Sequence, residues 1–592
     1  MNYSGSLDSF PHSPASTQPS QVVVRSRLLV SSFIGVLLIL AAYSVYLAFH
    51  RIYQVDEFQN FYMARVQAMG QYKEFFTNSS LFLFGPLSWL ARSHLSSVGM
   101  ITGARLVFLV VFWINLLLIA RIAGGPLLSA RGLAALAGAA TLTPLWDYGF
   151  EVRHDNLVLT GVLLIWWLAR ARPVGVLTYI VSGVVTVALL FIAVKAVVYA
   201  VPLSFAIIAF PPARSQSRWK AAGAWLGGAA VTVVFVRVYY GTSGAWDNYL
   251  STFRTVSQYS SSAASSGKFP PWDTLERLLT ESSLLLAITL AALIAVAVDL
   301  WRRKRAALTW EGLLPETLLF LGALGALIIN PTPFAYNLVN LAPFAFILAF
   351  KYAMEAGKGL HFSRELWIPV AAILLIVHFI PFTLLTYRHV YYPNSRQKQL
   401  MRLAEQMTDP DKDPVYDGIG MVPTRRSADF YWYLHSLAAQ RVNTGIRDFL
   451  QVRPAAVFIR SYRTDWLPEA DNQFIDSRYV RLSDEFEVLG MLLPAGGGSF
   501  EIFHAGRYCI VPASSLDPRG HASDSGNGAT ETIAGFLDGI KLSNQPVEFT
   551  VGKHQLQTSS NATLAVVWVG PTLNSVPYLT PGDHRFLFQN WY

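Results

Sequence analysis

The first two thirds of the chain alternate long apolar stretches with short polar connections. A helix needs about 20 mainly apolar residues to cross a hydrocarbon core roughly 30 Å thick. About eleven stretches approach that length, and they lie near residues 28–49, 101–120, 132–145, 156–168, 174–192, 196–210, 221–238, 282–300, 313–329, 334–350 and 366–385. The pattern predicts a polytopic α-helical transmembrane domain over residues 28–387, with the two termini on opposite sides of the bilayer.

After residue 387 the pattern changes to a mixed polar sequence with short strand-like runs. The runs at 456–459, 508–511 and 564–569 are rich in β-branched and aromatic residues, and turn-forming residues separate them. Residues 388–592 amount to roughly 200 residues, which is a normal domain size. We therefore expect a C-terminal soluble domain of α/β or β-rich type.

Basic residues fall in alternate connections between the apolar stretches, and the positive-inside rule places such connections in the cytoplasm. The basic groups are Arg25 and Arg27, Arg121 and Arg131, Arg170 and Arg172, residues 214–220, residues 302–305 and residues 351–358. This orientation predicts that Asp56, Arg153, Lys195 and the C-terminal domain share the exterior (periplasmic) face of the cytoplasmic, or inner, membrane. The Ser- and Pro-rich residues 1–27 are expected to form a disordered cytoplasmic tail before a retained first helix.

The composition agrees with a membrane protein, because 53% of the residues are hydrophobic and 14% are charged, against about 25% charged residues in soluble domains. The net charge of +9 is spread over the connections, so it indicates topology and predicts no nucleic-acid partner. Cys509 is the sole cysteine. An intramolecular disulfide framework is therefore excluded, and a cysteine-ligated metal site is implausible.

Several charged residues lie at the predicted membrane boundary, where charge is costly unless it has a partner or a function. Asp56 and Glu57 follow the first apolar stretch directly. Arg153 lies between acidic residues at positions 151 and 155, and Lys195 interrupts the apolar run 174–210. Carboxylates suit proton transfer, and Arg and Lys suit phosphate oxygens.

The same residues resemble a known family. Residues 54–64 read Gln-Val-Asp-Glu-Phe-Gln-Asn-Phe-Tyr-Met-Ala, Gly70 follows, and residues 84–90 read Phe-Gly-Pro-Leu-Ser-Trp-Leu. An acidic pair ahead of Tyr-x-Ala, a glycine and Pro-Leu-x-x-Trp-Leu resemble the GT-C glycosyltransferases that use polyprenyl-phosphate sugars. The nearest branch holds the protein O-mannosyltransferases and the lipid A aminoarabinose transferases.

Three further stretches are similar to that branch. Residues 151–156, Glu-Val-Arg-His-Asp-Asn, resemble its Arg-x-acidic motif, residues 194–196 resemble its lysine turn, and residues 336–343 resemble a late helix that carries Tyr and Pro. The resemblance covers residues 28–385. Two details depart from it, because Gly85-Pro86 replaces a double proline and no glycine follows Lys195.

The resemblance implies an inverting glycosyltransferase that moves a sugar from a polyprenyl-phosphate donor to a hydroxyl acceptor, with Asp56 as general base. Arg153 and Lys195 would hold the donor phosphate. Each residue also has a structural interpretation: Asp56 could cap a helix or pair with Arg51 or Arg65, and Lys195 could extend its amine to the membrane surface. Arg153 could pair with its acidic neighbours.

Glu57 has three interpretations: it orients the acceptor, it holds a divalent cation beside Asp56, or it pairs with an arginine. No cofactor is certain, and Mg²⁺ or Mn²⁺ stays open. His154 is expected to be solvated or packed, since the nearby sequence offers no other His or Cys at ligand spacing. The residues expected to support the site or touch the acceptor are Asp155, His154, Tyr62, Tyr336 and Asn337.

Residues 240–281 contain aromatic and cationic side chains among many serines, and they resemble a loop that closes over the donor in this family; a plain connector is the alternative. A lipid, a polysaccharide or a protein would serve as acceptor. A secondary transporter of a lipid-linked or anionic solute is the alternative function, and it would favour internal repeats and charges at mid-membrane. A membrane-anchored binding domain is a third class, but it needs far fewer spans.

Overall fold

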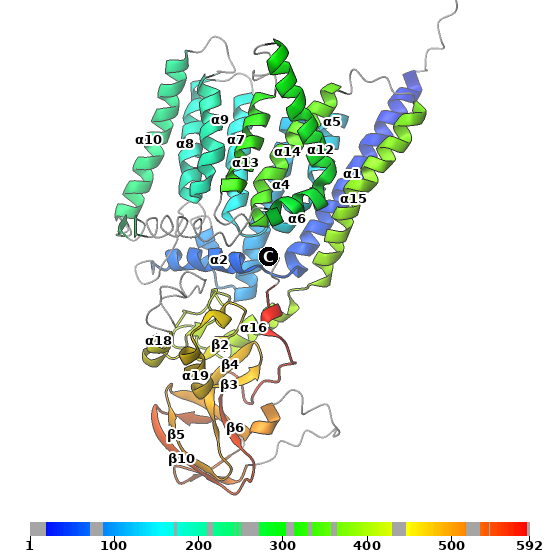
Figure 1. Cartoon of the computed structure of the whole chain (residues 1–592). Coiled ribbons are helices and arrows are strands. Elements are labelled where there is room, and N and C mark those ends of the chain that lie inside the picture. Colours follow the sequence, from blue (N-terminus) through cyan, green and yellow to red (C-terminus); the bar gives the residue numbers. More distant parts are fainter. Residues whose placement is uncertain are drawn as a thin grey trace, which may run out of the picture.

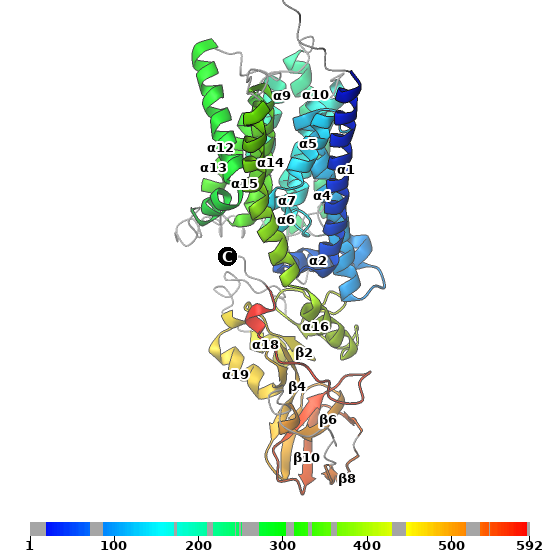
Figure 2. The ribbon, with the colours of Figure 1, turned by 90° about the vertical axis from the view of Figure 1, so that its right-hand side faces the viewer.

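A bundle of long helices forms one end of the molecule and a sheet region forms the other, as Figures 1 and 2 show. The computed structural model describes residues 19–70, 87–170, 175–209, 217–242, 244, 246–247, 250–251, 272–303, 313–329, 334–356, 364–428, 446–516, 533–543 and 545–588. The bundle contains α1 (Pro19–His50), α4 (Ser97–Gly124), α5 (Ala130–Ala139), α6 (Thr143–Tyr148), α7 (His154–Arg170), α8 (Val176–Ile192), α9 (Val197–Ala209), α10 (Arg218–Thr242), α12 (Trp272–Arg303), α13 (Leu314–Ile329), α14 (Leu338–Ala356) and α15 (Arg364–Tyr391).

Most described residues of each predicted apolar stretch are helical. Among the described residues, five helices are long and apolar enough to cross a bilayer, at 30–50, 97–124, 218–242, 272–302 and 335–356. Shorter apolar helices occupy 176–192, 194–209 and 314–329. The chain is therefore a helical multi-pass membrane protein, while eleven spans stay a prediction. Helix α1 begins at Pro19, within the expected tail, and residues 1–18 lie outside the described residues.

The third predicted stretch is divided between α5 and α6. The Thr141 hydroxyl donates to the carbonyl oxygens of Ala137 (3.1 Å) and Gly138 (3.0 Å), which satisfies carbonyls at the end of α5. Pro144 stands in the first turn of α6, where its missing N–H costs nothing. Helix α6 ends at Tyr148. The acidic segment between α6 and α7 therefore lies at the base of the bundle (Figure 1).

Helix α2 (Val55–Ala68) lies across the base of the bundle, between the bundle and the sheet region (Figures 1 and 2). Its buried side chains share one hydrophobic core with the sheet region. The Phe58 ring meets Phe588 edge-on at 5.8 Å, and the Tyr62 hydroxyl accepts from the Ser427 backbone N–H at 2.9 Å. Helix α2 is therefore a structural part of both halves.

The sheet region contains two sheets. The strands are β1 (Val415–Tyr416), β2 (Val457–Ile459), β3 (Tyr479–Ser483), β4 (Phe486–Leu493), β5 (Gly497–Ile502), β6 (Gly506–Pro512), β7 (Gly535–Leu537), β8 (Ile540–Lys541), β9 (Val547–Phe549), β10 (Gly552–Thr558) and β11 (Leu564–Trp568). Seven strands have the order β1-β2-β4-β11-β6-β9 with β3 also on β4, and four have the order β5-β10-β7-β8. Only β1 and β2 are parallel among these pairs. The expected C-terminal sheet region and its three strand-like runs are confirmed.

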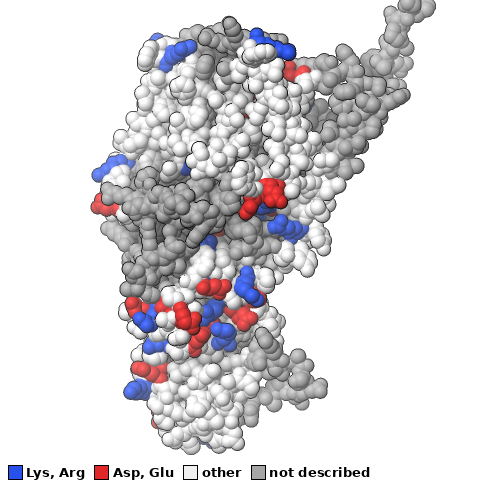
Figure 3. Space-filling view, in the orientation of Figure 1, with Lys and Arg blue, Asp and Glu red and all other residues white. Residues whose placement is uncertain are grey.

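Short helices complete the sheet region and join it to the bundle. They are α16 (Ser395–Gln406), α18 (Ile446–Val452), α19 (Glu469–Arg478), η4 (Thr464–Trp466), η5 (Ala513–Leu516) and η7 (His584–Phe586). The Gln397 side chain on α16 accepts from the Tyr53 N–H (2.8 Å) and donates to the Tyr53 carbonyl (2.9 Å). In Figure 3, the visible flank of the bundle is largely uncharged, and Lys, Arg, Asp and Glu gather toward its ends and over the sheet region.

Gly420→Ala should loosen the contact between α2 and the sheet region. Gly420 has φ +77°, and a Cβ there would lie 2.5 Å from the Tyr62 Cβ. Both the backbone conformation and the close approach oppose a side chain. We expect a lower thermal midpoint and faster proteolysis between the two halves.

Gly539→Ala is the matched control, because Gly539 has φ +84° with nothing within 4 Å of its added Cβ. This variant would have the same unfavourable backbone conformation as Gly420→Ala, but its new Cβ would clash with no neighbouring atom. Equal losses of stability in the two variants would contradict the close packing of Gly420 on α2.

Candidate functional site

Four chain segments far apart in sequence meet at the base of the bundle. Asp56 lies in the first turn of α2, Arg153 immediately precedes α7, Lys195 lies in η2 (Val194–Ala196) and Tyr336 lies in η3 (Ala335–Asn337). The η2 turn follows Ala193, whose extended backbone (φ −153°) breaks the path between α8 and α9. That break turns Lys195 out of the apolar run and toward the other three segments.

The four segments form a chain of alternating charges. The Asp56 carboxylate pairs with the Arg153 guanidinium, and Arg153 Nε lies 3.6 Å from Asp155 Oδ2. Asp155 also pairs with the Lys195 amine through its other oxygen. The Tyr336 ring lies against both cations, 4.0 Å from Arg153 and 4.7 Å from Lys195. These five residues are termed the charge network.

The chain of charges is partly exposed at its two ends, and the Tyr336 ring beside it is also partly exposed. The Asp56 and Lys195 side chains are 26% and 25% exposed, while those of Arg153 and Asp155 are 4% and 0% exposed. Asn337 adds a contact, since Lys195 Nζ donates to its Oδ1 at 3.3 Å. An incoming ligand therefore meets a carboxylate at one end of a short path and an amine at the other, and Arg153 lies between them.

Of the three interpretations of Glu57, the structure shows the pairing with an arginine. It is fully buried, both of its oxygens bind the Arg105 guanidinium, and Oε2 also accepts from the Gln54 N–H at 2.9 Å. A divalent cation held jointly by Asp56 and Glu57 does not fit these contacts. Within the described residues, the structure brings together no group of three or more His, Cys, Asp or Glu suited to a metal ion.

Two buried arginines behind the network were missed as site residues. Arg105 on α4 donates to the carbonyl oxygens of Arg51 (2.7 Å) and Ile52 (3.0 Å) as well as to Glu57. Arg51 pairs with Glu151 and donates to the Trp146 carbonyl at 2.9 Å. Arg105 carried a usable signal, because it is a charged residue inside a predicted span. Arg51 was weighed as a partner of Asp56, and the structure gives that place to Arg153.

A second ionic cluster adjoins the charge network. Arg277 on α12 pairs with Asp147 and Glu281 and donates to the Tyr148 hydroxyl at 3.0 Å. The Tyr148 ring lies between two guanidinium groups, 5.8 Å from Arg277 and 5.9 Å from Arg153. Arg277 falls within the predicted loop 240–281 but had not been singled out.

The remaining predicted residues have different surroundings. His154 is 32% exposed, and its Nε2 lies 3.6 Å from Asp155 Oδ2, beside the network. Tyr62 is buried against the sheet region instead, where its hydroxyl accepts from Ser427, so it joins none of the network contacts described above. Of the expected donor-closing loop, Trp246 lies under Arg237 at 4.5 Å. Four further aromatic and cationic residues of that segment, Tyr249, Arg254, Tyr259 and Lys268, lie outside the described residues.

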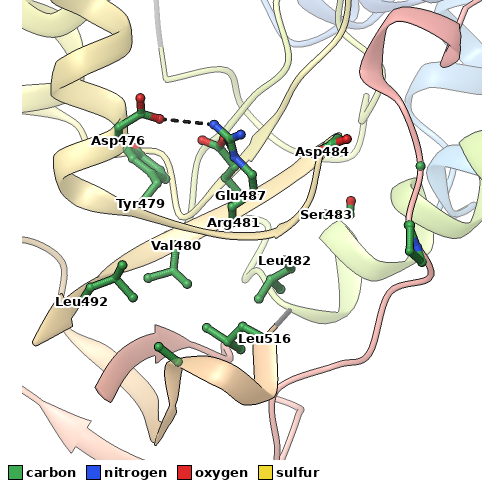
Figure 4. Close-up of a pocket in the computed structure, with 13 residues that line it drawn as sticks. Asp476, Tyr479, Val480, Arg481, Leu482, Ser483, Asp484, Glu487, Leu492 and Leu516 are labelled. Atoms are coloured by element: carbon green, nitrogen blue, oxygen red, sulfur yellow. Dashed lines mark hydrogen bonds and ion pairs between the residues drawn. The ribbon is translucent and has the colours of Figure 1, made fainter. Parts of the chain in front are cut away.

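A cavity of about 540 Å³ lies in the sheet region, away from the charge network. Figure 4 shows it between β3, β4 and η5, with Leu482, Leu492 and Leu516 pointing into it. On its charged wall, Arg481 contacts both Asp476 (3.4 Å) and Glu487 (3.1 Å), and Asp484 also lines the cavity. It shares no residue with the network and offers no group for proton transfer near the membrane.

Comparison with known proteins gives a likeness of structure. The chain is similar to the oligosaccharyltransferase of Archaeoglobus fulgidus in complex with Zn and sulfate, at 12% identity and a TM-score of 0.41, over 79% of this chain and 72% of that one. It is also similar to the oligosaccharyltransferase AglB of the same organism in complex with an inhibitory peptide and a dolichol-phosphate, at 11% identity and a TM-score of 0.41, over 81% and 73% of the two chains.

No protein-family model matches the sequence. No curated protein matches it either. We therefore base the functional conclusions on the side chains of the charge network and not on correspondence with another protein.

Arg105→Met should destabilise the base of the bundle strongly. The change leaves the Glu57 carboxylate buried without its cation, and breaking a buried pair in this way costs about 3–5 kcal/mol. The double variant Arg105→Met with Glu57→Gln removes the stranded charge and should recover part of the loss. Thermal unfolding of the purified chain in detergent measures both. A double variant no more stable than the single one would contradict a mainly structural pair.

Proposed function

We propose that the protein is an inverting glycosyltransferase that transfers a sugar from a polyprenyl-phosphate donor to a hydroxyl acceptor. The reaction would take place at the exterior, periplasmic face of the cytoplasmic membrane. The observation that supports this best is the charge network, in which a reachable carboxylate and a reachable amine lie on either side of a buried arginine. Residues 28–387 would form the catalytic domain and residues 388–592 the exterior domain.

The chemistry assigns a role to each end of the network. The acceptor oxygen attacks C1 of the donor sugar, the bond between C1 and the phosphate oxygen breaks, and the electron pair leaves with polyprenyl phosphate. Asp56 takes the acceptor proton as the new bond forms, a contribution of typically about 10²–10⁴ in rate. Arg153 and Lys195 stabilise the charge that develops on the phosphate. A single displacement inverts the configuration at C1.

The balance of charge in the network predicts how the donor binds. Its two cations, Arg153 and Lys195, already face Asp56 and Asp155, and Arg153 Nη1 also lies 3.7 Å from Glu151 Oε2. A donor phosphodiester adds a negative charge, so it must compete with one of these carboxylates. Asp155 is fully buried and holds both cations, and Glu151 is fully buried and paired with Arg51, whereas Asp56 is partly exposed and pairs with Arg153. We infer that the phosphate replaces Asp56 on Arg153.

This exchange would link donor binding to activation of the base. Once Arg153 binds the phosphate, the Asp56 carboxylate turns to the acceptor hydroxyl with its lone pairs available. Without donor, Asp56 stays paired and the site does not present an unshielded base to water. Tyr336 lies against both cations and keeps their stems in place during the exchange.

Asp56→Asn should abolish transfer while donor binding remains. The amide cannot take the acceptor proton, so turnover should fall by at least about a hundredfold. Donor affinity should hold or rise, because the competing carboxylate on Arg153 is gone. Transfer is measured with synthetic polyprenyl-phosphate sugars and the purified chain, and binding with the same donors.

Asp411→Asn is the matched control, since Asp411 is an exposed carboxylate of the sheet region, and it should leave turnover unchanged. Wild-type turnover in Asp56→Asn would remove Asp56 from the mechanism.

Lys195→Ala should weaken the hold on the phosphate. An interaction with a charged group is worth about 1.5–3 kcal/mol, so donor affinity or the rate of phosphate release should fall about ten- to a hundredfold. Lys195→Arg keeps the positive charge beside Asp155 and should restore part of the activity. Donor titration and single-turnover rates separate binding from chemistry, and unchanged values for both in the alanine variant would defeat the assignment.

A further inference from the structure

One loop of the sheet region lies near the helix that carries the proposed base. Residues 461–466 follow β2 and end in η4, and they are termed the aromatic loop. Asp465 of this loop pairs with His584 at 2.9 Å, and Phe588, four residues after His584, meets Phe58 of α2 at 5.8 Å. The aromatic loop therefore lies near the beginning of α2, the helix whose first turn carries Asp56.

Arg463 is held between two aromatic rings of this loop. Its guanidinium lies 5.2 Å from the Tyr462 ring and 4.7 Å from the Trp466 ring, and its Nε donates to the Tyr462 hydroxyl at 3.1 Å. Trp466 is 37% exposed, and the neighbouring Asp465 is exposed and paired with His584 at 2.9 Å. The loop thus presents an aromatic face beside a fixed guanidinium and a carboxylate.

The backbone of the aromatic loop is occupied by its own turn. The Thr464 N–H donates to the Ser461 carbonyl at 2.8 Å, and the Thr464 hydroxyl donates to the same carbonyl at 2.7 Å. The Trp466 N–H donates to the Arg463 carbonyl at 3.3 Å. These main-chain groups are therefore not available to bind an extended peptide, so the side chains of the loop must recognise the ligand.

We propose that the aromatic loop binds the acceptor and that the acceptor is a saccharide. This inference rests on the proposed function. The C–H face of a sugar ring packs against the exposed indole of Trp466, and neighbouring hydroxyls bind the fork of Arg463 and the carboxylate of Asp465. The hydroxyl at the far edge of the ring then reaches Asp56. The turn is rigid before the acceptor arrives, which lowers the entropy lost on binding.

Binding is tested by saturation-transfer NMR on the full chain in lipid nanodiscs. The probes are methyl glycosides and short oligosaccharides of several common hexoses and pentoses, compared with an N-acetylated Ser/Thr peptide amide. We expect saturation of sugar protons with the wild type, at least about fivefold weaker signals with Trp466→Ala, and intermediate signals with Trp466→Phe, since a smaller ring offers less contact. Phe536→Ala is the matched control, because Phe536 is 51% exposed on β7 in the other sheet.

Transfer assays separate this inference from the proposed function. With a productive donor and saccharide acceptor, Trp466→Ala should raise the acceptor KM at least about tenfold, while the donor KM stays unchanged. Suppose that the wild type releases polyprenyl phosphate. The acceptor site alone would then be overturned by any one of three results: binding of the peptide, no binding of glycosides, or glycoside binding that survives Trp466→Ala. A wild type that releases no polyprenyl phosphate from any donor would instead defeat the transferase.

Discussion

The buried pair between Glu57 and Arg105 fixes the position of everything else in the site. Arg105 holds Glu57 with one part of its guanidinium and the carbonyl oxygens of Arg51 and Ile52 with the rest. It thereby sets the path by which the chain leaves α1 and turns into α2. Asp56 precedes Glu57 by one residue, so the same contacts fix the start of the helix that carries the proposed base. In the acidic pair, Glu57 supplies a buried structural carboxylate and Asp56 supplies a partly exposed one.

Several charges are buried around this point, and each has a partner. Isolated charges cannot remain in such surroundings, but pairs with additional hydrogen bonds can. Arg105 with Glu57 is a closed pair with no exposed end, and Arg51 with Glu151 is equally buried, with Glu151 Oε2 also 3.7 Å from Arg153 of the network. The charge network differs because both of its ends are open. Closed pairs hold a framework, whereas a chain of pairs with open ends can exchange one partner for a ligand. That difference separates the groups that support the site from those that would act in it.

Sequence patterns predicted the helices, the three strand-like runs and the residues of the network. Hydropathy sufficed for the helices because apolar stretches of that length have few other stable structures. The network could be predicted because Asp56, Arg153 and Lys195 are charges at apolar boundaries. Pairing could not be predicted: Arg51 and Arg65 were the candidate partners of Asp56, and the tertiary path of α2 brings Arg153 to it instead. Tyr62 was assigned to the site from a motif, but the direction of its side chain depends on which face of α2 the sheet region covers.

Helix α2 also explains how the proposed site would combine a lipid donor with a water-soluble acceptor. Its first turn carries Asp56 into the charge network, and its buried face belongs to the core of the sheet region. The aromatic loop stands on the same sheet, directly after β2. Base and aromatic loop are therefore linked through one packed core, and such cores deform little. The distance between Asp56 and a sugar held on Trp466 would consequently be set by the fold itself. Substitutions in the aromatic loop can then change which acceptor is held without moving the carboxylate that takes its proton.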